Sequence, residues 1–276
     1  MLAAESLDAV LVASPPSTHL EIWRQLNHLG LAVFMEKPFV LAGQLEELPA
    51  ARAPLMINFN RRFWPAYRRL AQLAATPQTG KVMRIKAVLH IDVLRWSTVT
   101  QHRLSPEEGG VLFDLGSQAL DLVCMIAGAE PKSLSISVHS RRWPGDHIVL
   151  ESQFPSGAHG TCDLAYADYN REEVAVEGTA GTWRLANPNM SVHWLAAGTP
   201  GPGVLGAMGD LAVLGYRGLL RSRSMLRYSI AAALRMFFDG VRNGGPLRPG
   251  IEDAVANVRW LETVEATSKQ AAEAIR

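Results

Sequence analysis

The sequence predicts two architectures in succession, α/β and then α+β: a small parallel sheet with helices, followed by a large, open, mostly antiparallel sheet with flanking helices. In the first sixty residues, short apolar runs alternate with a helical pattern, which is typical of parallel strands buried on both faces. From residue 132 onward, segments of alternating polarity follow one another at short intervals, separated by turns rich in Gly, Pro and Asn. We therefore expect two domains, residues 1–59 and 60–276.

The first domain is expected to contain a strand–helix–strand unit. The helix between the first two strands begins after Thr18, where Glu21 completes a capping box, and it ends at Gly30. A second, shorter helix is expected at residues 42–48. The three expected strands are residues 7–13, 31–35 and 54–59.

The second domain is expected to combine helices with one antiparallel sheet. Turn residues separate most of the predicted strands, so consecutive strands are expected to pair as hairpins. The predicted helices cover residues 62–75, 109–121, 211–228 with its continuation over 229–241, and 251–275. The predicted strands cover residues 82–92, 133–140, 147–154, 158–167, 173–178, 182–186 and 191–195.

The composition is that of an ordinary globular protein. The chain has 276 residues, of which 48% are hydrophobic, and a formal net charge of +1. This balance gives no electrostatic reason to expect nucleic acid or an anionic membrane as a partner. No apolar run approaches the roughly 20 residues of a membrane span, and residues 1–8 do not resemble a signal peptide. With only Cys124 and Cys162 as cysteines, we expect a cytoplasmic protein.

The segment Glu36-Lys37-Pro38 follows directly on a buried strand. The carboxyl ends of parallel strands are where open α/β sheets bind their ligands. A lysine at such an edge can donate a proton or stabilise negative charge that develops on an oxygen. The alternative is structural: Glu36 and Lys37 form a solvated pair, and Pro38 merely ends the strand.

A second segment with potential chemistry is the predicted helix at residues 109–121. Asp114, Gln118 and Asp121 would share one of its faces, being spaced at i, i+4 and i+7. An acid and an amide one turn apart can bind neighbouring hydroxyl groups of a sugar. Alternatively, Asp114 only lies near the positive end of the helix dipole. Four histidines, His139, His147, His159 and His193, are scattered over predicted strands, so we expect no metal site.

Four segments occur in this order along the chain: residues 8–19, Gly30, Glu36-Lys37-Pro38 and residues 58–63. Taken together, they resemble the glucose-fructose oxidoreductase, inositol dehydrogenase and rhizopine-catabolism (Gfo/Idh/MocA) family. The resemblance implies a Rossmann domain followed by a substrate domain, and an enzyme that depends on NAD or NADP. Members of the family begin with a Gly-rich first strand, but no G-x-G-x-x-G turn precedes Leu7. About 60 residues of the family's first domain are thus expected to be missing, through truncation or a partial sequence.

The resemblance also implies catalytic roles for Lys37, Asp114 and Gln118. In the family, Lys, Asp and a His surround the reacting carbinol, and Gln118 stands at the position of that His. A neutral amide cannot accept a proton at working pH. Three interpretations stay open: Lys37 acts alone, the substrate needs no His, or the protein no longer catalyses. Asp121 is expected to be a structural buried acid.

The remaining site residues are also implied by the resemblance. The substrate is expected to be a sugar or polyol, with a homo-oligomer formed through the open face of the large sheet. The residues expected to bind the cofactor are Ser14, Pro15, Pro16, His19, Glu36, Pro38, Asn60 and Arg61. Those expected to contact substrate are Asn60, Arg61 and Tyr169.

The function expected from the sequence is hydride transfer between nicotinamide and a sugar, polyol or related carbinol. The alternative is a non-catalytic or truncated family member that acts as a binding or assembly subunit. The substrate, its stereochemistry and the choice between NAD and NADP stay open.

Overall fold

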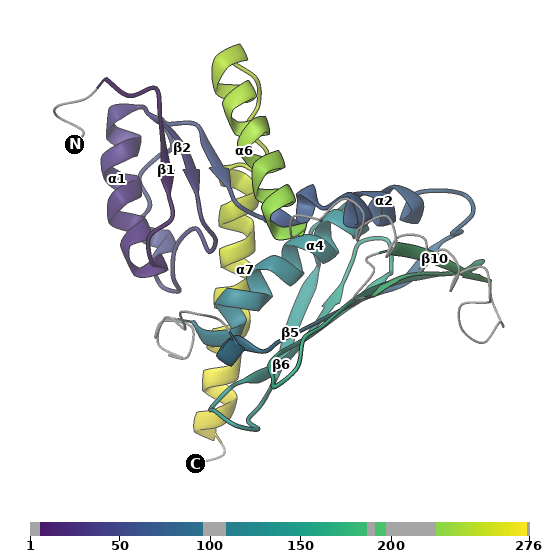
Figure 1. The fold of residues 1–276 in the computed structure, drawn as a ribbon. Coiled ribbons are helices and arrows are strands. Elements are labelled where there is room, and N and C mark those ends of the chain that lie inside the picture. The colour runs from purple at the N-terminus through teal and green to yellow at the C-terminus, as the bar shows by residue number, and fades with distance from the viewer. Residues whose placement is uncertain (1–5, 96–108, 187–190, 197–224, 275–276) are drawn as a thin grey trace.

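The computed structural model describes residues 6–95, 109–186, 191–196 and 225–274. It contains a small three-stranded sheet near the N-terminus and a large seven-stranded sheet (Figure 1). None of the described helices is long and apolar enough to cross a membrane.

The small sheet consists of three parallel strands. They are β1 (Ala9–Val12), β2 (Ala32–Met35) and β3 (Leu55–Ile57), which lie side by side in that order. Helix α1 (His19–Leu29) connects the first two strands, so the predicted strand–helix–strand unit is confirmed. This is a Rossmann-type arrangement, as the sequence predicted.

Both faces of β2 and β3 are covered, which explains why these strands are apolar throughout, whereas Leu11 of β1 is 50% exposed. Val33 and Met35 belong to the apolar cluster that includes Trp23 of α1. Phe34 points to the other face, where its ring centroid lies 5.6 Å from that of Phe237 in α6 (Met225–Asn243). Successive side chains of a strand point to opposite faces, so each face needs its own cover.

Two local predictions in the first domain are wrong. Residues 42–48 form only a 3₁₀ turn, Leu45–Glu47, because Gly43 adopts a positive φ of 79° and so short a segment gains little from helix formation. The capping box is absent as well. Thr18 has a helical backbone conformation and its hydroxyl turns back, donating to the Pro15 carbonyl at 2.7 Å. The predicted end of the helix at Gly30 is confirmed, because this residue is left-handed with φ 69°.

The large sheet has the strand order β10-β9-β8-β4-β7-β6-β5. Strands β4 and β7 are parallel, and every other neighbouring pair is antiparallel, which confirms a mostly antiparallel sheet. The strands are β4 (Val82–Ile91), β5 (Ser133–His139), β6 (His147–Gln153), β7 (His159–Tyr166), β8 (Arg171–Gly178), β9 (Gly181–Ala186) and β10 (Ser191–Ala196).

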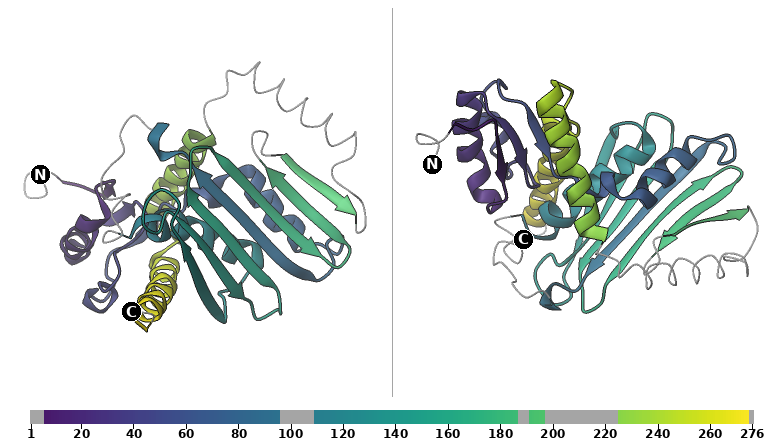
Figure 2. Two further views of the ribbon diagram at one scale, coloured as in Figure 1. Left: turned by 90° about the horizontal axis from the view of Figure 1, so that it is seen from below. Right: turned by 45° about the horizontal axis from the view of Figure 1, so that its top comes forward.

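Helices cover one face of the large sheet. They include α2 (Pro65–Ala74) and α4 (Ser117–Ala127), while α7 (Ile251–Ala274) contacts both β5 and the small sheet's β3. We call this side the covered face. No helix of the described residues lies on the opposite side, which we call the open face (Figure 2).

The predicted single helix at residues 109–121 is interrupted. A π-helical turn, Leu112–Gly116, precedes α4, and Gly109 and Gly110 both have positive φ values. Such turns insert an extra residue into an α-helix and are frequent at functional sites. The insertion changes which side chains of this segment share a face.

Candidate active site

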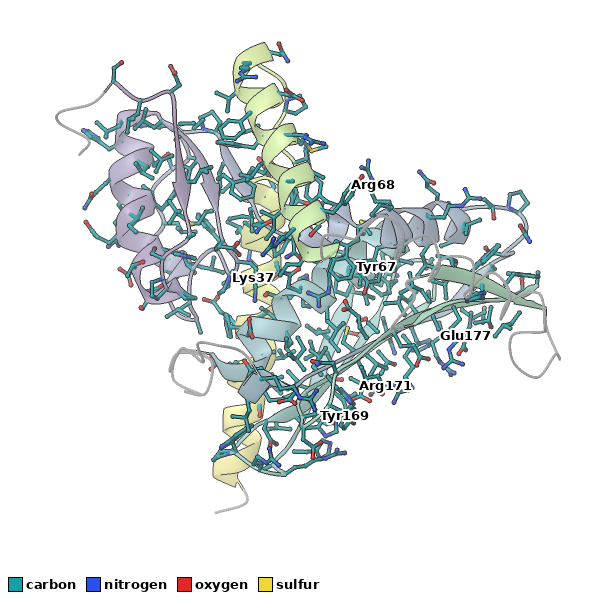
Figure 3. All side chains as sticks on the ribbon, viewed as in Figure 1. Lys37, Tyr67, Arg68, Tyr169, Arg171 and Glu177 are labelled. Carbon is teal, nitrogen blue, oxygen red and sulfur yellow. The ribbon has the colours of Figure 1, made fainter. Side chains whose placement is uncertain are left out.

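Lys37 lies just beyond the carboxyl end of β2, in a segment held firmly on both sides. The backbone ladder of the small sheet continues past β2: the Glu36 amide donates to the Val12 carbonyl at 2.9 Å, and the Asn58 amide donates to the Met35 carbonyl at 2.8 Å. This pairing fixes the backbone from which Lys37 projects. Figure 3 shows Lys37 between the small sheet and the helices of the covered face.

The Lys37 ammonium binds Asp114 through two contacts. Its Nζ donates to the Asp114 backbone carbonyl at 2.6 Å and forms a short ion pair with carboxylate Oδ1. Each of the two side chains is only 12% exposed. The sequence analysis named both residues as catalytic candidates, and the structure brings them together.

The π turn accounts for part of this geometry. Asp114 is the middle residue of the turn, where the regular helical ladder of hydrogen bonds is interrupted. Its carbonyl oxygen accepts from Lys37, and the Ser117 hydroxyl donates to the Phe113 carbonyl at 2.7 Å. The turn thus offers both a backbone and a side-chain oxygen of Asp114 to the lysine.

The second oxygen of the Asp114 carboxylate is bound by a residue that the sequence analysis missed. The Tyr166 hydroxyl donates to Asp114 Oδ2 at 3.0 Å from the end of β7. Tyr166 is 6% exposed. Alternation along the predicted strand at residues 158–167 would have placed Tyr166 on the same face as Leu164, which was the available signal.

Three buried amide side chains of this region keep an oxygen without a hydrogen-bond partner among the described residues. They are Asn58, Asn60 and Gln118. Asn58 also donates through Nδ2 to Glu36 Oε1 at 2.6 Å. An unpaired buried acceptor is costly, so these oxygens fit a ligand that supplies O–H or N–H donors.

Asp121 belongs to a different cluster. Arg62 donates to both carboxylate oxygens of Asp121 at 2.6–2.9 Å and reaches Asp253 in α7 at 2.9 Å. Burial alone would lower the pKa of the Arg62 guanidinium, but its pairing with Asp121 outweighs burial and raises that pKa. This pairing supports the structural role expected for Asp121 as a buried acid.

His19 is completely buried and joins two loops. One ring nitrogen lies 2.8 Å from the Pro38 carbonyl and the other lies 3.0 Å from the Ser14 carbonyl. These loops follow β2 and β1, where the cofactor-binding segments Ser14-Pro15-Pro16 and Glu36-Lys37-Pro38 were predicted. In this position, His19 orients the two loops without presenting its own ring at the surface.

Arg61 is bound within the protein. Arg61 Nε donates to Glu172 Oε1 at 2.9 Å, and the Tyr67 hydroxyl donates to the same oxygen at 2.6 Å. Burial raises the pKa of the Tyr67 hydroxyl well above its ordinary value, and the charge of Glu172 adds to this effect. The guanidinium of Arg61 therefore already has a carboxylate partner.

The structure does not bring Tyr169 to Lys37. The Tyr169 hydroxyl lies 2.9 Å from His90 Nδ1, and its side chain is on the open face. Figure 3 shows Tyr169 and Arg171 on the side of the large sheet opposite Tyr67.

Comparisons with known proteins are consistent across sequence and structure. A family profile described as the oxidoreductase family, NAD-binding Rossmann fold, matches residues 1–53. A second profile, the GFO/IDH/MocA C-terminal domain, matches residues 67–184. The two matched segments together cover more than half of the chain.

Relatives with curated names include inositol 2-dehydrogenase of Rhizobium meliloti, which is 26% identical over 48% of this chain and 40% of its own length. The D-apiose dehydrogenase of Paraburkholderia graminis is 26% identical over 99% of this chain and 73% of its own length. The matched part of the chain spans about half or less of the length of the first three curated relatives.

Solved structures share the fold. GenD2 from gentamicin A biosynthesis, solved in complex with NAD, superposes with a TM-score of 0.76 at 24% identity, covering 98% of this chain and 78% of its own. Levoglucosan dehydrogenase, solved with NADH and levoglucosan, gives a TM-score of 0.74 at 15% identity, covering 96% and 78%. With both profiles and these folds in agreement, the chain belongs to the Gfo/Idh/MocA family of oxidoreductases, whose Rossmann domain binds NAD.

Proposed function

We propose that this chain is an NAD(P)-dependent dehydrogenase that acts on a CH–OH group of a sugar, a polyol or a related carbinol. The observation that carries the proposal is the Lys37 ammonium, held by two oxygens of Asp114 at the carboxyl edge of the small parallel sheet. Ligands of open α/β sheets bind at this edge. The names of the relatives supply the substrate class.

The residues present fit the nicotinamide end of such a cofactor and a polyhydroxylated substrate beside it. The loops after β1 and β2 are joined by His19, and the buried amide oxygens of Asn60 and Gln118 accept no hydrogen bond from the part of the chain that the structure describes. Carboxamide N–H groups and sugar hydroxyls are donors that fit these oxygens. Bound nicotinamide would supply the hydride acceptor in oxidation and the hydride donor in reduction.

Lys37 is the residue proposed to handle the proton. In the direction of reduction, Lys37 Nζ donates its proton to the substrate oxygen as negative charge develops there. In the direction of oxidation, the neutral amine accepts the hydroxyl proton. Asp114 keeps the amine oriented, and Tyr166 in turn fixes Asp114.

Gln118 is proposed to orient the substrate. Its Oε1 accepts a hydrogen bond from a substrate hydroxyl, but an amide cannot carry the proton. In the proposed mechanism, Lys37 therefore acts without the histidine that the resemblance places at this position. Glu36, Pro38, Ser14, Pro15 and Pro16 are proposed to border the cofactor.

The first experiment measures binding of NADH and NADPH to the purified 276-residue chain by fluorescence titration. We expect saturable binding, followed by turnover with a panel of inositols, pentoses and hexoses. Absence of binding at millimolar nucleotide would refute the proposal for this chain. A Lys37→Met variant that binds nucleotide but does not turn over would locate the defect at the proton-transfer step.

One observation favours a second candidate, a non-catalytic binding or assembly subunit: the neutral Gln118 stands where the family resemblance places an acid/base. In this case a second copy of the chain would occupy the open face of the large sheet. Substituting Gln118→His separates the two candidates. A gain in polyol oxidation supports the enzyme, whereas nucleotide binding without turnover in both forms supports the subunit.

A further inference from the structure

Three potential metal ligands converge on the open face of the large sheet, on the side opposite Lys37. They come from three neighbouring strands: His90 from β4, His147 from β6 and Asp163 from β7. Nε2 of each histidine lies 2.9 Å from Asp163 Oδ1. One ligand atom from each residue can be chosen so that all three lie within 4.8 Å of one another.

The register of the strands creates this cluster. His90 and His147 are both paired with Ala165 of β7, one from each side. Asp163 lies two residues before Ala165 and therefore on the same face. Ala165 is small and 2% exposed, so the two imidazoles meet above its methyl group.

We propose that His90, His147 and Asp163 form a binding site for a divalent transition metal ion, with Zn²⁺ as the best match. Two imidazole nitrogens and one carboxylate oxygen are a ligand set that zinc uses in proteins when one position is left to water. Tetrahedral coordination with bonds of about 2 Å separates neighbouring ligand atoms by about 3.3 Å. The two N–O distances of 2.9 Å require only a small expansion.

The nitrogen atoms that bind the ion must first lose their protons, and the arrangement of the cluster allows this. A histidine that donates through Nε2 to Asp163 must carry its proton on Nδ1 before Nε2 can bind a metal. For His90 the acceptor is already in position, because the Tyr169 hydroxyl lies 2.9 Å from Nδ1. Ligating histidines commonly donate their second N–H to such a partner, which fixes the ring.

The charges and the burial are also suitable. A carboxylate supplies negative charge to a divalent ion, and the two imidazoles bind it as neutral ligands. The side chains of His90, His147 and Asp163 are 6%, 13% and 26% exposed, respectively. The cluster is therefore shielded on the protein side and accessible to an ion from the open face.

The test is a calorimetric titration of the full chain with zinc sulfate after treatment with a chelator. We expect one ion per chain with a dissociation constant in the micromolar range or below. His147→Ala and Asp163→Asn should each weaken binding at least tenfold. The matched control is His159→Ala, which removes an exposed histidine from the other end of β7 and should leave the affinity unchanged.

Cobalt gives a second readout that does not depend on a variant folding. Bound Co²⁺ should show the visible absorption of a tetrahedral or five-coordinate site, and Zn²⁺ should displace it. Zinc affinity that is equal in the wild type and in a folded Asp163→Asn variant would overturn the proposal, as would absence of binding at millimolar zinc. These readouts require no nucleotide and no turnover, so they are independent of the proposed enzymatic function.

Discussion

Two polar clusters lie on opposite faces of strand β7. Each contains a carboxylate, and the two carboxylates are bound by different types of hydrogen-bond donor. On the covered face, the Asp114 carboxylate accepts a hydrogen bond from Tyr166 and pairs with Lys37. On the open face, Asp163 is bound by two imidazoles. An ammonium and a phenol exchange protons but do not readily coordinate a metal, whereas imidazoles do both. In the two proposals, donor type, rather than burial of the acid, separates the site for proton transfer from the site for an ion.

The largest effect should come from the lysine of the covered face. Lys37→Met removes the proposed proton donor, so turnover should fall by about 10²–10⁴-fold. Nucleotide affinity should change by much less, because the segments that border the cofactor stay in place. Steady-state kinetics combined with nucleotide titration measures both quantities.

Lys86→Met is the matched control for this prediction. Lys86 is an exposed lysine on the open face of β4, and its loss should leave turnover within twofold of the wild type. Equal loss of activity in the two lysine variants would contradict the assignment of proton transfer to Lys37 on the covered face.

The next effect concerns ion pairs on the two faces. Arg62→Met leaves Asp121 and Asp253 without their shared guanidinium and should lower the free energy of unfolding by about 3–5 kcal/mol. The open-face pair Arg84–Glu177 is exposed on both sides, so Arg84→Met should cost about 1 kcal/mol or less. Urea denaturation of both variants measures the difference, and equal losses would contradict it.

A smaller effect distinguishes two tyrosines on opposite faces. Tyr166→Phe removes a hydrogen bond to a charged carboxylate and should cost about 1.5–3 kcal/mol of stability. Tyr169→Phe removes a bond from a half-exposed side chain and should cost about 1 kcal/mol or less. Thermal unfolding of the two variants at one pH is sufficient, and a larger loss for Tyr169→Phe would reverse the expected order.

The smallest effect depends on pH. Burial alone would raise the pKa of Glu173, but hydrogen bonds from Arg171 and Arg184 outweigh it and hold that pKa below the ordinary 4.5. The native state therefore binds fewer protons than the unfolded state, and the stabilisation is present above about pH 4.5 and lost as the pH falls through the lowered pKa.

Glu173→Gln removes this titration. Wild type should be more stable than the variant near neutral pH, and the difference should shrink toward pH 3. Added salt should also reduce it, because the pair lies on the open face and is partly solvated. A difference that is constant with pH would show that Glu173 acts through packing alone.

The two faces also differ in how many of their functional residues could be predicted from the sequence. Lys37 and Asp114 could be named as candidate site residues because each lies in a recognisable motif. The strands of the large sheet could be predicted from the alternation of polar and apolar residues and from the turn residues between them. The cluster at His90 was not predictable from spacing, because its members come from three strands and meet only through the register of β4, β6 and β7.

Two further features could not be predicted from the sequence pattern. The π turn at Leu112–Gly116 inserts a residue that a regular helical pattern does not show, and Asp114 and Asp121 bind different partners, Lys37 and Arg62. Arg61 pairs with Glu172 of β8, and this pairing could not be predicted because the two residues lie far apart in the chain. The domain boundary after residue 59 and the individual site roles stay predictions.

The cover of the small sheet has a consequence for folding. Phe34 of β2 packs against Phe237 of α6, and the Ile57 amide donates to the Pro249 carbonyl just before α7. Contacts between such distant parts of a chain slow folding, since a long loop must close before they form. During synthesis, one apolar face of the small sheet therefore stays uncovered until α6 and α7 have left the ribosome. Nascent chains stalled before residue 225 should accordingly depend on chaperones.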